Sequence, residues 1–333
     1  MGKLAKEELQ KLLGCIRKDP RVLVPPLPGY DAGVHFLGDK CMVVSTDPCI
    51  DVPEEWFGWL LIHYAASDVA VFGAKPEYCT INLLGPASTK PEVFQNVMRQ
   101  VCSAAEKLDM TVVTGHTGIY EGVSQLIGVC TAYGTVPKEK VIMPGNAKAG
   151  DLILCTKSVG LELVVNFSFM HKALAQRLFG VKRAEELARL VELQSCVNEA
   201  LKLAELSWVN SMHDATEGGL VAALNEVADA SEVGFRVEME KVPVSQEAWM
   251  LRDHFKLALD EVLSMSSTGT ILAAVDPKAK GEVEEALRRN GVSASFLGKF
   301  TKSKDRVLAK GDGDVAFPQV ADDPYSKILS LQF

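Results

Sequence analysis

Three aspartates stand at positions where a carboxylate could bind a metal ion. Asp31 follows a Pro-Gly pair, Asp47 follows the apolar run VVST, and Asp68 lies inside a predicted apolar helix. A carboxylate among apolar neighbours is costly unless it is paired. Carboxylates that converge on one point suit Mg²⁺, which prefers oxygen ligands and commonly bridges to nucleotide phosphates. For Asp47 alone, a cap at a strand end is the alternative.

A second polar group lies in a predicted loop at 211–219, directly before a predicted helix. Residues 213–219 read HDATEGG, and the apolar residues that follow have helical spacing. A glycine pair at a helix start lets a phosphate approach free N–H groups, and the helix dipole favours an anion there. The alternative is a capped helix with Asp214 or Thr216 as N-cap. The sequence alone leaves both interpretations open.

A third signal is the run VVTGHT at 112–117, which predicts a strand ending in a tight turn. The turn would present His116 and Thr117. Taken alone, His116 is more typical of an ordinary loop histidine than of a ligand. His116 becomes a candidate site residue only together with the three aspartates and the HDATEGG loop.

The composition is that of a soluble globular enzyme with two domains. The chain has 333 residues, of which 47% are hydrophobic and 23% charged, and a domain commonly has roughly 100–200 residues. The net charge of -8 argues against a nucleic-acid partner, because phosphate contacts need clustered Lys and Arg. No apolar signal region and no uninterrupted apolar run of about 18 residues is found. We therefore expect a cytoplasmic protein without a membrane segment.

The eight cysteines are spread along the chain without a C-x-x-C pair. Neither disulfide nor zinc spacing is present, so most should be buried, reduced thiols. Cys15 differs because it follows a glycine near the N-terminus, but an ordinary thiol is the favoured interpretation.

The N-terminal half predicts a sheet with helices on one face. After a helix at 3–18 and a proline-rich extended segment at 21–29, the elements follow the order ββαβαββ. The predicted elements are strands 32–37 and 41–47, a helix at 54–73, a strand at 78–85, a helix at 91–108, and strands 111–115 and 124–136. The second face of this sheet would stay apolar and need a cover. A second subunit is the natural cover.

A Pro-, Gly- and Lys-rich segment at 137–151 predicts the boundary between domains 1–140 and 150–333. The second domain is expected to be mixed α/β. Its predicted elements are a strand at 152–157, helices near 163–178, 182–206 and 218–230, strands at 235–240 and 270–275, and a helix at 278–290.

Seven motifs, in order, resemble the aminoimidazole ribonucleotide synthetase (PurM) superfamily, with the hydrogenase maturation protein HypE as the nearest branch. The motifs are PGYDAGV at 28–34, VVSTDP at 43–48, SDVAVFGAKP at 67–76, VTGHTG at 113–118, SVGLE at 158–162, HDATEGGLVAALNEVA at 213–228 and SSTGTILAAV at 266–275. They span nearly the whole chain, and an ordered series is far more specific than one glycine pattern.

The resemblance implies an α+β, PurM-like two-domain fold. The N-terminal domains of two subunits would close a β-barrel, giving a homodimer, and the C-terminal domain would be mixed α/β. ATP and Mg²⁺ would lie in a cleft between the sheet ends and the second domain, with Asp31, Asp47 and Asp68 at the metal positions. The nucleotide- or phosphate-binding set would be Asp31, Asp47, Gly115, Thr117, Asp214, Thr216, Gly218 and Gly219. The catalytic set would be Asp68, His116 and Glu217.

The implied reaction is phosphorylation of an oxygen of a small amide-, carbamoyl- or phosphate-type acceptor, as in a synthetase or dehydratase. The alternative is a non-catalytic protein that keeps the fold and binds a nucleotide or a maturation partner protein. The expected partners are therefore a second copy, a small-molecule acceptor and a maturation protein.

Several residues depart from the family pattern. Tyr30 and His116 stand where the family commonly has acidic residues, which weakens Mg²⁺ binding. The C-terminus, YSKILSLQF, lacks the cysteine tail of HypE. The N-terminal Cys or Lys motif of selenophosphate synthetases and the Asp-Gly loop of thiamine monophosphate kinases are also missing. The acceptor therefore stays unnamed.

Overall fold

The computed structural model describes residues 4, 6–311 and 313–329, which form two compact units. The N-terminal unit comprises Ile16–Leu27 and Asp31–Val141. The C-terminal unit comprises the first helix, α1 (Lys6–Leu13), Pro28–Tyr30 and the described chain from Ile142 onward. Each unit has its own sheet.

The N-terminal unit is built on a six-stranded sheet in the order β1-β2-β3-β6-β4-β5. Its strands are β1 (Val22–Val24), β2 (Gly33–Leu37), β3 (Lys40–Cys49), β4 (Tyr78–Pro86), β5 (Thr111–Tyr120) and β6 (Ile127–Pro137). Neighbours are antiparallel except β4 and β5, which run parallel. The expected order of strands and helices is confirmed, with β1 added in the proline-rich segment. The sheet of one chain is open at β1 and β5, so one chain does not close the expected barrel.

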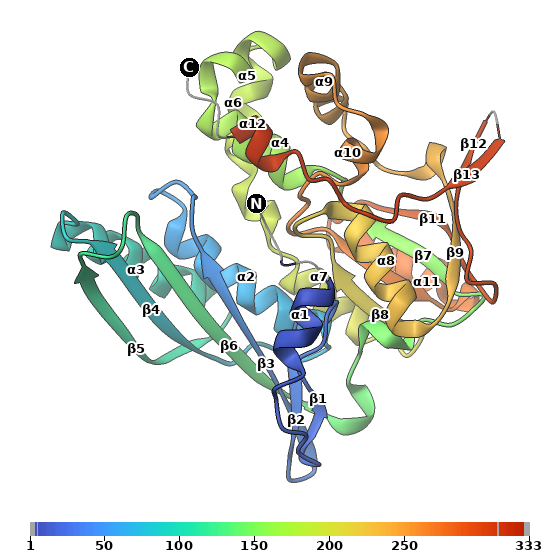
Figure 1. Cartoon of the computed structure of the whole chain (residues 1–333), viewed down its shortest axis with the longest axis horizontal. Coiled ribbons are helices and arrows are strands. Elements are labelled where there is room, and N and C mark those ends of the chain that lie inside the picture. Colours follow the sequence, from blue (N-terminus) through green and yellow to red (C-terminus); the bar gives the residue numbers. More distant parts are fainter. Residues whose placement is uncertain (1–3, 5, 312, 330–333) are drawn as a thin grey trace. The chain divides into compact units, whose positions relative to one another are not determined.

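Two helices, α2 (Phe57–Val71) and α3 (Pro91–Lys107), cover one face of this sheet (Figure 1). Helix α2 packs on β3 and β6 with α3 beside it, and all its residues except Tyr64 are buried. The helices cross closely at Gly58, where a Cβ would lie 2.3 Å from the Val97 carbonyl oxygen. Buried and half-buried residues alternate along β6, as expected for a sheet covered on one face.

The C-terminal unit has a seven-stranded sheet in the order β13-β12-β9-β11-β7-β10-β8. Its strands are β7 (Leu152–Thr156), β8 (Val209–Asp214), β9 (Gly234–Glu238), β10 (Ile271–Val275), β11 (Ala294–Thr301), β12 (Arg306–Lys310) and β13 (Gly313–Ala316). All five residues of β10 are buried because helices cover both faces of the sheet. The expected mixed α/β character is confirmed.

Some helices of this unit pack on the two faces of the sheet, and others form a separate helical cluster. Helix α8 (Gly219–Ser231) packs on one face of the sheet, and α7 (Val197–Ala204) and α11 (Lys280–Arg289) on the other (Figure 1). A second apolar cluster is formed mainly by α4 (Leu161–Met170), α5 (Lys172–Phe179), α6 (Val181–Ala188), α9 (Gln246–Phe255), α10 (Leu259–Leu263) and α12 (Tyr325–Leu329). Among the described residues, no helix combines the length and apolar character needed to cross a membrane.

Several predicted boundaries are wrong. The described part of the helix expected at 3–18 ends at Leu13, before Gly14; residues 3 and 5 lie outside the described residues. The helix expected at 163–178 is broken at His171, which has non-helical backbone angles. The helix expected at 182–206 is two helices, α6 and α7, because Ser195 is extended. Residues 211–214, expected in a loop, belong to β8.

Most cysteines are buried, as expected from the sequence. Six cysteines are buried, all eight are free, and Cys15 and Cys102 are exposed. The buried thiols fill the apolar interior, as small hydrophobic side chains do.

A buried ammonium group joins three segments of the C-terminal unit. Lys157 follows β7, and its Nζ lies 2.5 Å from Glu199 Oε1 on α7. The same nitrogen donates to the carbonyl oxygens of Leu193, Ser195 and Gly269 at 2.6–2.9 Å. The side chains of Lys157 and Glu199 are 11% and 5% exposed. This arrangement satisfies both charges and fixes the turn before α7 against the end of β7.

We expect Lys157→Met to lower the free energy of unfolding by about 3–5 kcal/mol, because Glu199 would stay buried without its counter-ion. Urea unfolding measures this loss. The matched control is Lys202→Met, which removes an exposed pair with Glu205 and should change stability by less than about 0.5 kcal/mol. Equal losses in the two variants would contradict a structural role for the buried pair.

Candidate functional site

Asp68 is a buried carboxylate held in place by a serine. It lies in α2, is 6% exposed, and its Oδ2 accepts a hydrogen bond of 2.6 Å from Ser45 Oγ on β3. A hydroxyl donor partly offsets the cost of burying the carboxylate. The sequence-based expectation of a partner for Asp68 is met by this contact, which joins α2 to the sheet.

Asp47 lies on the same side of the sheet as Ser45, two residues further along β3. It is half-buried and is paired in register with Cys130 on β6. The pKa of the Cys130 thiol is raised by its hydrogen bond with Cys79 and by burial, and further by the negative charges of Asp47 and Asp68. The negative charges of both carboxylates therefore act on the Cys130 thiol, beneath α2.

Asp31 precedes β2 and is half-buried. Within the part of the chain that the structure describes, Asp31, Asp47 and Asp68 do not bring three ligand atoms within 4.8 Å of one another. Mg²⁺ usually keeps several waters and takes one or two carboxylates plus substrate phosphates. Asp47 and Asp68 can supply such a pair of oxygen donors.

His116 does not lie in a turn, contrary to the expectation from sequence. Strand β5 continues to Tyr120, because β4 pairs with it in parallel along its whole length. The His116 ring Nε2 lies 2.6 Å from the Tyr120 hydroxyl oxygen, and both side chains are exposed. Gly115 and Thr117 are likewise exposed on this edge strand.

The sheet separates His116 from Asp47 within one chain. Register places Asp47, Cys130, Ile81 and Gly115 in one row across four strands. Three strand spacings give roughly 14 Å between the ends of this row. Because His116 follows Gly115, its side chain points to the opposite face of the sheet.

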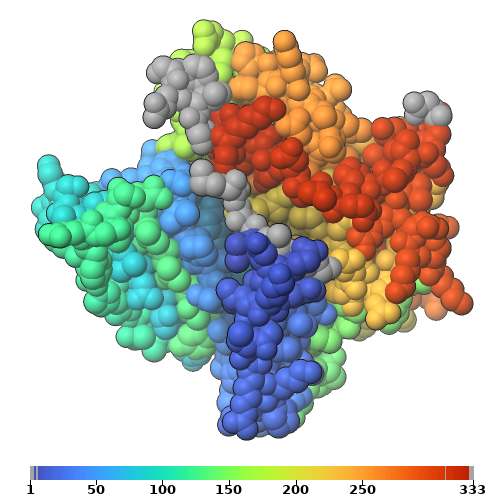
Figure 2. Space-filling view, viewed as in Figure 1, coloured from blue at the N-terminus to red at the C-terminus, as the bar shows by residue number. Residues whose placement is uncertain are grey.

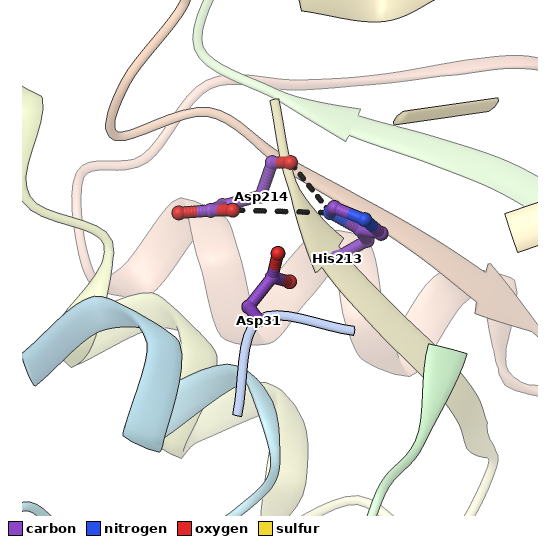
Figure 3. Close-up of side chains that lie close together, drawn as sticks. All are labelled: Asp31, His213 and Asp214. Atoms are coloured by element: carbon purple, nitrogen blue, oxygen red, sulfur yellow. Dashed lines mark hydrogen bonds and ion pairs between the residues drawn. The ribbon is translucent and has the colours of Figure 1, made fainter. Parts of the chain in front are cut away.

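His213 and Asp214 end strand β8 and are both buried (Figure 3). His213 Nδ1 lies 2.7 Å from the Asp214 carbonyl oxygen and 3.8 Å from its Oδ1. On the other side of the ring, Nε2 lies 2.9 Å from Glu226 Oε2 on α8. Oxygen acceptors on both sides fix the imidazole between β8 and α8.

At the start of α8, the glycine amides are not free, and the N-cap is neither of the two residues expected from the sequence. Gly218 is the N-cap, in a left-handed conformation with φ of +77°, and no side chain of its own can cap the helix. Its N–H donates to Asp323 Oδ2 at 3.0 Å, while the Gly219 N–H donates to the Thr216 carbonyl oxygen at 3.0 Å. The two expected anion donors are thus bonded within the unit, and neither Asp214 nor Thr216 is the N-cap.

Glu217 is exposed beside this turn, and Gly219 is closely packed. A Cβ on Gly219 would lie 2.3 Å from the Met265 carbonyl oxygen. A side chain at Gly219 would therefore disturb the fold whether or not an anion binds.

Glu162 is a buried carboxyl that the sequence analysis did not single out. It lies in the first turn of α4 and accepts a 2.5 Å hydrogen bond from Thr268 Oγ1. Burial raises the pKa of Glu162 to about 7, and the charges of Asp323 and Glu217 add to this against the opposing Thr268 bond. The signal in the sequence was a glutamate inside the apolar run LELVVNF.

Tyr30, in place of an acidic residue, anchors the segment Pro28–Tyr30 within the C-terminal unit. Burial raises the pKa of Tyr30, and a hydrogen bond with the Gly145 backbone opposes the rise. Next to it, Gly29 has φ of +77°, and a Cβ there would lie 2.9 Å from Glu226 Cβ. The tyrosine therefore has a packing role in the C-terminal unit.

Two family profiles match this chain. The profile of the AIR synthase related protein, N-terminal domain, matches residues 29–136, and that of the C-terminal domain matches residues 148–310. The chain belongs to the AIR synthase related protein family. The resemblance predicted from the seven motifs is confirmed.

This AIR synthase-related chain is similar to proteins with different named activities. It is 27% identical over 287 residues to a putative hydrogenase expression/formation protein of Methanocaldococcus jannaschii, covering 84% of this chain and 81% of the relative. It is 25% identical over 347 residues to selenide, water dikinase of Carboxydothermus hydrogenoformans, covering 93% and 95%. The crystal structure of hydrogenase maturation protein HypE in complex with ATP has the same fold, with a TM-score of 0.71 at 18% identity over 97% of each chain.

The raised pKa of Glu162 predicts a stability that falls as pH rises. Between about pH 4.5 and 7 the folded state keeps a proton that the unfolded chain loses, so the free energy of unfolding decreases across this window. Glu162→Gln removes this decrease. The variant should gain about 3 kcal/mol relative to the wild type between pH 4 and pH 8.

Denaturant unfolding at several pH values measures this difference. Glu240→Gln, on the exposed surface, controls for the loss of a carboxyl group. Parallel pH profiles for wild type and Glu162→Gln would contradict a protonated Glu162 in the folded protein.

Proposed function

We propose that this chain is an ATP- and Mg²⁺-dependent enzyme that phosphorylates an oxygen of a small amide-, carbamoyl- or phosphate-type acceptor. The observation that carries the proposal is the pair formed by Asp47 and the buried Asp68, in a chain of this family. Support also comes from a relative named as a dikinase and from the ATP named with the similar HypE structure.

The oxygen donors of the N-terminal unit fit a magnesium ion. Asp47 and Asp68 would hold it, with Asp31 as a further acidic residue near β2. Bound Mg²⁺ would neutralise phosphate charge. Ser45 orients the Asp68 carboxylate through its hydroxyl, so one oxygen of Asp68 is positioned before any ligand arrives.

In the C-terminal unit, we assign Thr216, Gly218 and Gly219 to binding phosphate oxygens, Asp214 to the same nucleotide-binding group, and Glu217 to orienting the acceptor. Because the Gly218 and Gly219 amides already have partners, a phosphate must displace at least one of them. The Asp323 bond to Gly218 comes from outside the turn, so its loss breaks no hydrogen bond within the turn.

The residues of β5 fit this proposal through a second subunit. Gly115, His116 and Thr117 lie on an exposed edge strand, as do the apolar side chains of Val113 and Ile119. Burying such apolar surface favours association. We therefore propose a cytoplasmic homodimer, and, from the hydrogenase formation relative, a maturation protein as a further partner.

A non-catalytic nucleotide-binding protein is the second candidate. It is favoured by His116 and Tyr30, which stand where acidic residues are common and are engaged with Tyr120 and Gly145. Such a protein would bind a nucleotide without releasing ADP. Measuring ADP release with amide and carbamoyl acceptors separates the two candidates.

We expect Asp68→Asn to lower Mg²⁺-dependent affinity for a non-hydrolysable ATP analogue at least tenfold, because the variant loses a charge but still accepts the Ser45 bond. Calorimetric titration at fixed Mg²⁺ measures the affinity. The control is Asp51→Asn, at an exposed position of the same unit with φ of +54°, a conformation that asparagine tolerates. Unchanged affinity in Asp68→Asn would remove Asp68 from the site.

A further inference from the structure

The chain after β13 crosses the start of α8 and is anchored on both sides of it. Phe317 is buried and packs edge-on against Phe235, with ring centroids 4.9 Å apart. At the other side, Ile328 and Leu329 of α12 are buried in the second apolar cluster, and the Tyr325 hydroxyl accepts a bond from Asn166. Residues 318–324 have no regular structure, and all of them except the buried Pro324 are at least partly exposed where the segment passes over the start of α8 (Figure 2).

The centre of this segment is fastened to the start of α8 by one carboxylate. Asp323 Oδ2 accepts from the Gly218 N–H at 3.0 Å and from Ser266 Oγ at 2.5 Å. Its Oδ1 accepts from the Tyr325 N–H at 3.0 Å and faces the Ser266 N–H at 3.4 Å. A charged group from 105 residues away thus occupies the position that the glycine turn offers to an anion.

Residues of this segment also shield the Gly218 turn. Asp323 lies near the buried carboxyl of Glu162, whose pKa is raised by burial and further by the negative charge of Asp323. Ala321 covers Gly218 closely, since a Cβ on Gly218 would lie 2.8 Å from Ala321 Cβ. An external anion cannot reach the Gly218 amide while Ala321 and Asp323 stay in place.

We propose that residues 318–324 form a latch in which Asp323 occupies the anion position at the start of α8 and must leave before an external oxyanion can bind there. The proposal rests on the phosphate-binding role assigned above to the Gly218 turn. An incoming oxyanion takes over the bonds from the Gly218 N–H and the Ser266 hydroxyl. The anchors at Phe317 and α12 keep the released latch attached.

The test compares Asp323→Ala with Asp322→Ala, its exposed neighbour, in the full chain, using inorganic phosphate as the probe. Calorimetric titration should give at least tenfold tighter phosphate binding for Asp323→Ala than for the wild type. Asp322→Ala should stay within twofold of the wild type. Asp323→Asn, which keeps an acceptor oxygen but not the charge, should give an intermediate gain and serves if the alanine variant folds poorly.

Hydrogen exchange supplies a second measurement. Saturating phosphate should speed amide exchange of residues 319–323 and of Tyr325, whose N–H donates to Asp323, in the wild type, while Asp323→Ala should show fast exchange there without phosphate. Phosphate affinity unchanged by both Asp323 substitutions, or no phosphate binding in any variant, would overturn the latch.

Binding of the ATP analogue distinguishes a failure of the latch from a failure of the proposed function. If the analogue binds wild type and Asp323→Ala with Mg²⁺ but phosphate affinity does not rise, the latch fails and the enzyme proposal stands. If phosphate affinity rises but neither protein binds the analogue, the latch stands and the enzyme proposal fails.

Discussion

The burial of the Asp68 carboxylate constrains the whole N-terminal unit. A charge inside an apolar helix needs a partner from another element, and Ser45 of β3 supplies one. This contact sets how α2 lies on the sheet and brings Asp68 to the side that Asp47 occupies. The pKa of Cys130 is raised first by its hydrogen bond with Cys79 and by burial, and the further rise from the charges of Asp47 and Asp68 follows from the same arrangement. A pair of acidic oxygen donors therefore exists before any ligand binds.

The N-terminal sheet could be predicted from sequence because its pattern is strong and local. Alternation along β6 and the near-continuous apolar character of α2 reflect a sheet covered on one face. The turn expected at His116 was wrong, because a glycine followed by polar residues looks like a turn unless a neighbouring strand is known. Strand β4 provides that neighbour, and its effect cannot be found in the residues of β5 alone.

The C-terminal unit was less predictable because long-range contacts decide its local structure. The carbonyl oxygens of Leu193 and Ser195, inside the expected long helix, accept bonds from one buried lysine, Lys157. The start of α8 was predicted to have free amides or a local cap. Instead its N-cap is Gly218, whose N–H donates to Asp323, over a hundred residues away. The motif DATEGG predicted where the helix begins, but not which group binds its first amide.

We propose that the acidic pair of the N-terminal unit binds a nucleotide through Mg²⁺. The most direct test is calorimetric titration of the unmodified protein with a non-hydrolysable ATP analogue, with Mg²⁺ and with the metal chelated. We expect binding that is lost or strongly weakened without the metal. Equal affinity in both conditions, or no binding in either, would contradict nucleotide binding through Mg²⁺.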